Sequence, residues 1–161
     1  MLLSFISFVG LFAGLLLAIY TKEELKSGEK YFTLLTKVIL ATIIFVLLYY
    51  TKFNLLFLFI GAIIGYFVNK IYLYLGMSVI ISYVSKEFNI LTVSLVFLFG
   101  LPYGTLLKYY KMDKLGNVLL SMVLFLLPLL LLINNYYMVY SSALSSIAVG
   151  GIFSFLVKNG Y

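Results

Sequence analysis

Residues 53–85 read FNLLFLFIGAIIGYFVNKIYLYLGMSVIISYVS, and this stretch decides how many times the chain is expected to cross a membrane. A helix rises about 1.5 Å per residue, so a hydrocarbon core of about 30 Å needs roughly 20 apolar residues. The quoted stretch is too long for one such helix and barely long enough for two. Asn69-Lys70 is its polar break. Either two short helices meet there in a tight hairpin, or one helix reaches about Leu75 and the remainder folds back.

The composition indicates that the whole chain has lipid as its solvent. Of the 161 residues, 65% are hydrophobic and 10% are charged, whereas ordinary soluble domains carry about 25% charged residues. A water-soluble surface cannot be built from so few polar side chains, so we expect an all-α integral membrane protein in a lipid bilayer. The net charge is +6, but the lysines lie between apolar runs and mark topology, so no nucleic acid partner is expected.

The apolar runs outside this stretch predict five further membrane helices. Between the first two, Thr21 and Glu24 stand at capping-box spacing and Gly28 suits a left-handed helix end, which predicts a short helix at the membrane interface. No linker or change of composition divides the chain, so residues 1–161 are expected to form one transmembrane helical domain. The five helices are expected at residues 1–20, 31–50, 89–107, 116–133 and 136–157.

The lysine distribution favours seven short crossings over six, because cytoplasmic loops collect lysine. A hairpin at Asn69-Lys70 places nine lysines on one side and only Lys52 and Lys86 on the other, whereas six crossings divide them six to five. The N-terminus is then outside and the C-terminus cytoplasmic, in what we expect to be the cell membrane. The nine inner lysines are Lys22, Lys26, Lys30, Lys37, Lys70, Lys108, Lys111, Lys114 and Lys158.

Residue types that are missing narrow the chemistry. The chain has no Cys and no His, which argues against thiolate, haem and ordinary zinc sites, so neither a metal nor a cofactor is expected. The acids Glu23, Glu24, Glu29, Glu87 and Asp113 all fall in predicted loops. No cluster of acids or bases suited to hydrolysis or group transfer is visible, so the chain is not expected to be an enzyme.

Small residues at four-residue spacing predict helix-packing faces, because helices in lipid associate where small side chains let their backbones approach. Such faces occur in the first helix, in the first part of the 53–85 stretch and in the last helix. A serine stripe of this kind also suits the wall of a polar pathway, although packing is favoured. The predicted packing residues are Gly10, Gly14, Gly61, Gly65, Ser142, Ser146, Gly150 and Ser154.

A second set of residues forms a predicted substrate path. Proline removes a backbone donor and glycine weakens a helix, so a kink or break is expected at residues 100–104 and a second weak point at Pro128. Broken helices of this kind hold substrates in secondary transporters, whereas neighbouring helices also often restore such backbone groups. Lys37 is expected to snorkel to the interface rather than line an ion path. The path candidates are Gly100, Pro102, Gly104, Pro128, Ser78 and Ser82.

Two classes of function fit this sequence. One is a small solute or ion permease, a channel, or a membrane-embedded substrate-binding subunit, with kinked helices and serines along its path. The other is a non-catalytic structural or assembly subunit, whose glycine and serine stripes dock other membrane subunits or a second copy in a homo-oligomer. The lack of an acidic residue within a predicted membrane helix disfavours proton- or sodium-coupled transport.

Overall fold

The computed structural model describes residues 2–20, 25–132 and 136–158, and the secondary structure within these ranges is helical throughout. The predicted all-α fold is therefore confirmed. Of the short helix that was expected at 21–28, residues 25–28 are part of α2, which begins at Leu25 and includes Gly28, and Gly28 does not have a positive φ. Thr21 and Glu24 lie outside the described residues. The elements are α1 (Leu2–Tyr20), α2 (Leu25–Tyr50), α3 (Leu55–Phe67), α4 (Ile71–Ser82), α5 (Lys86–Tyr109), α6 (Leu115–Leu126), the 3-10 helix η1 (Leu127–Leu132), α7 (Tyr136–Val139) and α8 (Ser141–Lys158).

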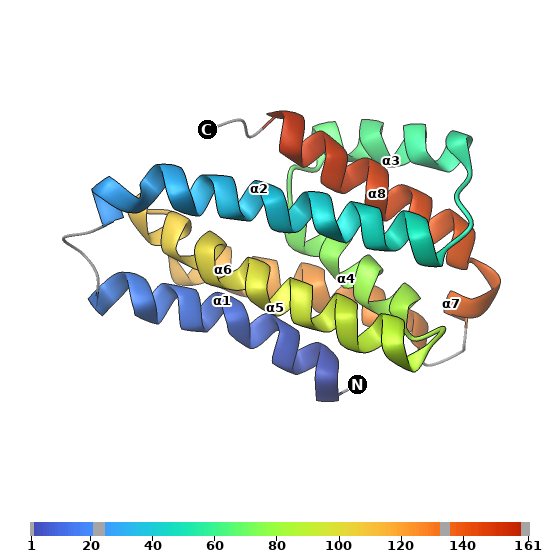
Figure 1. Ribbon diagram of the computed structural model, residues 1–161, viewed down its shortest axis with the longest axis horizontal. Helices are drawn as coiled ribbons and strands as arrows, with labels where there is room; N and C mark the ends of the chain where they lie inside the picture. Colours follow the sequence, from blue (N-terminus) through green and yellow to red (C-terminus); the bar gives the residue numbers. More distant parts are fainter. Residues whose placement is uncertain (1, 21–24, 133–135, 159–161) are drawn as a thin grey trace.

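Successive long helices alternate in direction along one axis of the bundle (Figure 1). The C-terminal ends of α1, α3, α5 and α8 point to one end, and those of α2 and α4 point to the other. The first end is called the lysine-rich end here. Lys52 follows the C-terminal end of α2 and Lys86 is the first residue of α5, so both lie at the opposite end. Lys37 lies midway along α2. The lysines near or beside the helix ends at the lysine-rich end are Lys30, Lys70, Lys108, Lys111, Lys114 and Lys158.

The short helix α4 lies at the centre of the molecule. Ten of its residues are buried, including Tyr72 and Tyr74, because α5, α6, η1 and α8 all pack around it. The predicted division of residues 53–85 at Asn69-Lys70 is present, with α3 on one side and α4 on the other. The two helices do not form a tight hairpin, however, since α8 packs on both α3 and α4 and lies between them.

Glycines bring α1 and α5 into backbone contact. A Cβ atom on Gly104 would lie 2.6 Å from the carbonyl oxygen of Leu11, and one on Gly14 would lie 2.7 Å from that of Gly100. Real Cβ atoms do not approach so closely, so both helices require glycine there. The predicted break at residues 100–104 is absent: α5 is one continuous helix that contains Pro102, and the close packing of α1 accompanies this stretch.

A second glycine-mediated contact joins α3 to α8. Gly61 faces the backbone of Ile147, and a Cβ on Gly65 would lie 2.8 Å from the Cα of Gly151. Gly150 in turn faces the backbone of α3 between Leu58 and Ala62. Ser146 also links the pair, because its hydroxyl accepts a hydrogen bond of 2.8 Å from the backbone N–H of Asn54, just before α3.

Four stretches are long and apolar enough to cross a membrane, namely Ser27–Tyr50, Lys86–Tyr109, Leu115–Leu132 and Ser141–Lys158. The third of them changes from α-helix to 3-10 helix at Leu127, next to Pro128, where a weak point was expected. Shorter apolar helices cover Ser4–Tyr20, Leu55–Phe67 and Ile71–Ser82. Many large apolar side chains on these helices are exposed, such as Phe45 at 70% and Phe67 at 78%, which suits contact with lipid rather than water.

Candidate functional site

Among the described residues, a cleft of about 590 Å³ lies on the lysine-rich side of α4. It exists because α3 and α4, with 13 and 12 residues, reach only about 20 and 18 Å, whereas α2 has 26 residues and reaches about 39 Å. Figure 1 shows that α8 and the connection from α3 to α4 finish short of the end reached by α2 and α6. The cleft is lined by Phe67, Asn69, Lys70, Ile71, Tyr72, Tyr103, Leu107, Met112, Asn117, Ser121 and Phe155.

The polar side chains of the cleft come from two elements. Asn69 and Lys70 belong to the connection before α4, and Lys70 is the N-cap residue, whose own side chain makes no capping bond. Asn117 and Ser121 stand one turn apart on α6. The Asn117 amide donates to the carbonyl of Met112 at 3.1 Å, and the Ser121 hydroxyl donates to that of Asn117 at 2.9 Å. These bonds orient both side chains beside the cleft.

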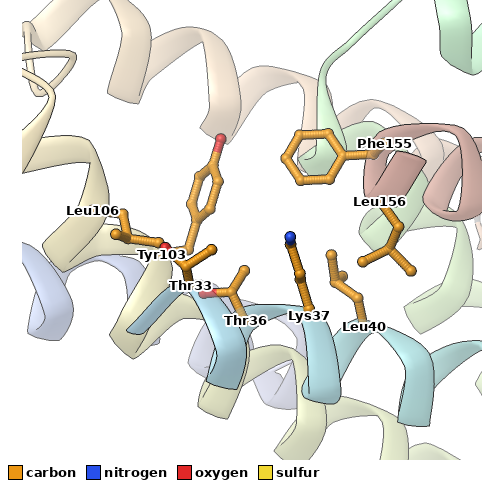
Figure 2. Close-up of a pocket in the computed structure, with 8 residues that line it drawn as sticks. All are labelled: Thr33, Thr36, Lys37, Leu40, Tyr103, Leu106, Phe155 and Leu156. Atoms are coloured by element: carbon orange, nitrogen blue, oxygen red, sulfur yellow. The ribbon is translucent and has the colours of Figure 1, made fainter. Parts of the chain in front are cut away.

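Lys37 enters the same region from α2. Figure 2 shows its nitrogen in the space between the rings of Tyr103 and Phe155, which both also line the cleft. The small cavity at this place has a volume of about 10 Å³, which is room for roughly one water molecule. Thr33 and Thr36 complete its polar wall. Lys37 therefore points toward α5 and α8, and it also lines a second pocket with Glu29 and Lys30; its snorkelling to the membrane interface stays a prediction.

Acidic groups near the lysine-rich end are engaged away from the cleft. The Tyr110 hydroxyl donates to Glu29 at 2.6 Å. Lys108 donates to Asp113 at 2.5 Å, and this hydrogen bond lowers the pKa of the Asp113 carboxyl below its ordinary value of 3.8. Among the described residues no acidic side chain lines the cleft, and neither Lys37 nor Lys70 forms an ion pair.

Aromatic rings close the inner wall of the cleft. Tyr103 stacks on Phe99 with ring centroids 5.0 Å apart, and Tyr72 packs edge-on against Tyr103 at 5.8 Å. Tyr72 also packs against Phe8 and Phe125. It is 2% exposed, and in the described part of the chain its hydroxyl has no hydrogen-bond partner. A buried hydroxyl without a hydrogen-bond partner costs folding free energy, so this wall contains a hydrogen-bond donor that has no acceptor among the described residues.

None of the six predicted path residues lines the cleft. Gly100 and Gly104 face the backbone of α1, and both Pro102 and Pro128 are buried. The Ser78 hydroxyl donates to the carbonyl of Tyr74 within α4. Ser82 donates to the carbonyl of Val79 and accepts a 2.9 Å hydrogen bond from the amide of Asn89. These serines are buried in the packed core rather than beside open space.

The predicted packing residues lie mainly at helix contacts. Gly10 and Gly14 face α5, Gly61 and Gly65 face α8, and Gly150 faces α3. Ser154 lies beside Gly65, and Ser146 bonds to the backbone before α3. Ser142 instead accepts, through its carbonyl, the hydroxyl hydrogen bonds of Ser145 and Ser146.

Asn117, Ser121 and Tyr103 are site residues that the sequence did not predict, and Asn69-Lys70 was expected to be a simple turn. A usable signal was present for the first two, since Asn and Ser four residues apart share one face of an otherwise apolar helix. No signal in the sequence pairs that face with the connection before α4. Within the described residues, no group of three or more metal-ligating side chains occurs.

No protein-family model, curated protein or solved structure matches this chain. Its class rests on the fold: four helices that can span a bilayer, apolar surfaces on most helices and glycine contacts between them. The protein is a multi-pass α-helical membrane protein.

Proposed function

We propose that this protein binds a small polar solute in the cleft beside α4 and acts as a permease, or as the membrane-embedded substrate-binding subunit of one. The observation that carries this proposal is the cleft itself. It has the volume of a small-molecule site, which is typically about 300–1,000 Å³, and it combines apolar walls with a few polar groups. Binding and release without covalent chemistry are sufficient for this role.

We further propose the topology of seven crossings, with the N-terminus outside and the C-terminus in the cytoplasm, in the cell membrane. The alternating directions of the helices support it, as does the gathering of lysines at one end. Because α3 and α4 are shorter than the usual hydrocarbon thickness, their crossings require a locally thinned or hydrated membrane. The cleft supplies hydration on the cytoplasmic side.

A pocket open on one side fits the packing better than a continuous channel. On the far side of the cleft, α4 is sealed by α5 and α8, and Ser78 and Ser82 are fully buried. Beyond them, the Ser4 and Tyr83 hydroxyls lie 2.9 Å apart in a hydrogen bond, and Tyr50 stacks on Phe88 at 4.7 Å. Passage of a solute therefore requires a second conformation, as in alternating access.

The alternative role as an assembly subunit receives less support. That role relied on small-residue stripes as docking faces for other chains. The glycines of α1 and α5 face each other, and so do those of α3 and α8, so these stripes are occupied within the chain. The exposed apolar side chains that remain are those expected of any lipid-facing helix.

Native mass spectrometry in mild detergent tests the proposed function. We expect the wild-type protein to retain a small molecule, and Ser121→Trp to lose it, because the indole would fill the cleft. The matched control is Leu119→Trp. Leu119 is 51% exposed on the outward face of α6, so this variant should retain the ligand. If the wild type holds no small molecule, moves no solute in vesicles and always purifies with another chain, the assembly role is correct instead.

A further inference from the structure

We infer that the solute bound in this cleft is an organic oxyanion, that is, a molecule with a phosphate or carboxylate group, which Lys37 and Lys70 hold from opposite sides. This inference rests on the proposed function and names the ligand class of the same site. The first observation concerns charge. Lys70 lines the cleft and Lys37 lines the small cavity that shares Tyr103 and Phe155 with it, and no acidic side chain among the described residues lines either of these two cavities.

The position of Lys37 supplies the first contact. Its ammonium lies near Tyr103 and Phe155, which line both the small cavity and the larger cleft. A lysine inside a membrane helix is expensive unless it is paired or hydrated, and such residues mark binding sites by default. Glu29 lines a further pocket with Lys37, but its carboxylate accepts a 2.6 Å hydrogen bond from Tyr110 and forms no ion pair with Lys37, so a ligand oxyanion would supply a counter-charge.

The start of α4 supplies the second contact. Lys70 and Ile71 both line the cleft at the start of α4. The N–H of Lys70 donates to the carbonyl of Val68 and that of Leu73 to the carbonyl of Lys70, which leaves the N–H groups of Ile71 and Tyr72 as the ones without a partner in their own helix. These N–H groups carry partial positive charge that favours an anion. Tyr72, which also lines the cleft, adds an independent sign of a missing partner, since its buried hydroxyl makes no hydrogen bond within the described chain.

The neutral polar groups of the cleft and its size narrow the class of ligand further. The amide of Asn117 and the hydroxyl of Ser121 face the same space from α6, and both suit the hydroxyl or carbonyl groups of an organic molecule. A cleft of about 590 Å³ is much larger than a bare inorganic anion needs. An oxyanion carried on an organic body fits both the lysines and the apolar walls.

Charged thiol reagents test this inference without knowledge of the ligand. The chain has no cysteine, so Ser121→Cys creates a single reactive position in the cleft. We expect a methanethiosulfonate that carries a sulfonate to react at least about tenfold faster than its trimethylammonium counterpart, relative to the same ratio for a free thiol. Lys37→Gln combined with Lys70→Gln should abolish the preference, and Lys37→Arg with Lys70→Arg should keep it.

The matched control carries the same change in net charge. Lys52→Gln combined with Lys86→Gln alters the opposite end of the bundle and should leave the preference unchanged. If all variants keep their helical circular dichroism but the preference survives loss of Lys37 and Lys70, or is lost equally in the control, the inference is wrong. Failure of both reagents to label Ser121→Cys would instead overturn the open cleft and, with it, the proposed function.

Protection of Ser121→Cys from labelling distinguishes the two sources from which the oxyanion could come. Slower sulfonate labelling in the presence of millimolar ribose 5-phosphate, but not ribose, assigns a soluble phosphorylated molecule. Slower labelling in phosphatidylglycerol vesicles than in phosphatidylcholine vesicles assigns a lipid headgroup. Both results support the inference, and protection by neither would show that the cleft is positively charged but holds no oxyanion.

Discussion

At the scale of the residue, glycine is required where two backbones touch. Gly104 on α5 lies so close to α1 that an added Cβ would meet the Leu11 carbonyl oxygen at 2.6 Å and the Leu15 nitrogen at 2.9 Å. Both atoms belong to a helix backbone, which cannot move aside as a flexible side chain can. Gly116 on α6 is the opposite case, because a Cβ added there would have no other atom within 4 Å.

We therefore expect Gly104→Ala to destabilise the protein by about 1–3 kcal/mol, through overpacking between α1 and α5. Gly116→Ala should be neutral or slightly stabilising, since alanine favours a helix over glycine by up to about 1 kcal/mol. Thermal unfolding of both variants in the same detergent, followed by circular dichroism, measures the difference. Equal midpoints for the two variants would contradict the close contact. The same contact means that a bulkier change such as Gly104→Leu tests folding rather than transport.

At the scale of the element, α4 depends on its neighbours for its polar as well as its apolar contacts. Ser82 at its C-terminal end accepts a hydrogen bond from Asn89 of α5, and both side chains are buried. Ser78, one turn earlier, bonds only to the carbonyl of Tyr74 in its own helix. The two serines are therefore alike in sequence spacing but unlike in what they connect.

Replacement of each serine by alanine distinguishes these roles. Ser82→Ala leaves the Asn89 amide buried without this acceptor, which should cost about 1–3 kcal/mol. Ser78→Ala removes a hydroxyl whose carbonyl partner stays in the helix, so its effect should be below about 1 kcal/mol. The measurement is the unfolding midpoint of each variant in detergent. A larger loss for Ser78→Ala would mean that this hydroxyl serves a contact outside α4.

At the scale of the whole molecule, unequal helix lengths produce the site. The short α3 and α4 and the offset α8 leave a recess that longer helices would fill, and Lys70 lines this recess. The proposed orientation puts the recess on the cytoplasmic side, where loops rich in lysine are retained.

Single cysteines in this cysteine-free chain report the orientation in oriented vesicles. We expect Asn69→Cys and Met112→Cys to react with an impermeant maleimide from the cytoplasmic side and Val84→Cys to react from the outside. The unsubstituted chain, which has no thiol, is the control for background labelling. Labelling of Asn69→Cys and Val84→Cys from the same side would rule out separate crossings by α3 and α4.

Several features of the fold were predictable because they depend on local composition. The apolar runs located the long helices, and Asn69-Lys70 correctly marked the division between α3 and α4. The helix end predicted at Gly28 was wrong, since helical backbone geometry continues through this residue. Of the kink or break predicted at residues 100–104, a break is absent, because helix-breaking tendencies are overridden where another helix packs closely, and a kink stays a prediction.

The amino-acid sequence by itself determined the solvent, the helical fold and the faces on which small residues gather, since each of these follows from side-chain size and polarity along the chain. Only the tertiary structure decided that α8 separates α3 from α4, that Lys70, Asn117 and Ser121 line one cleft, and that Lys37 lines the small cavity next to it. The physical reason is that helices in lipid are apolar on nearly every face. Periodicity then carries little information about which faces meet, and helix length and backbone approach settle the neighbours.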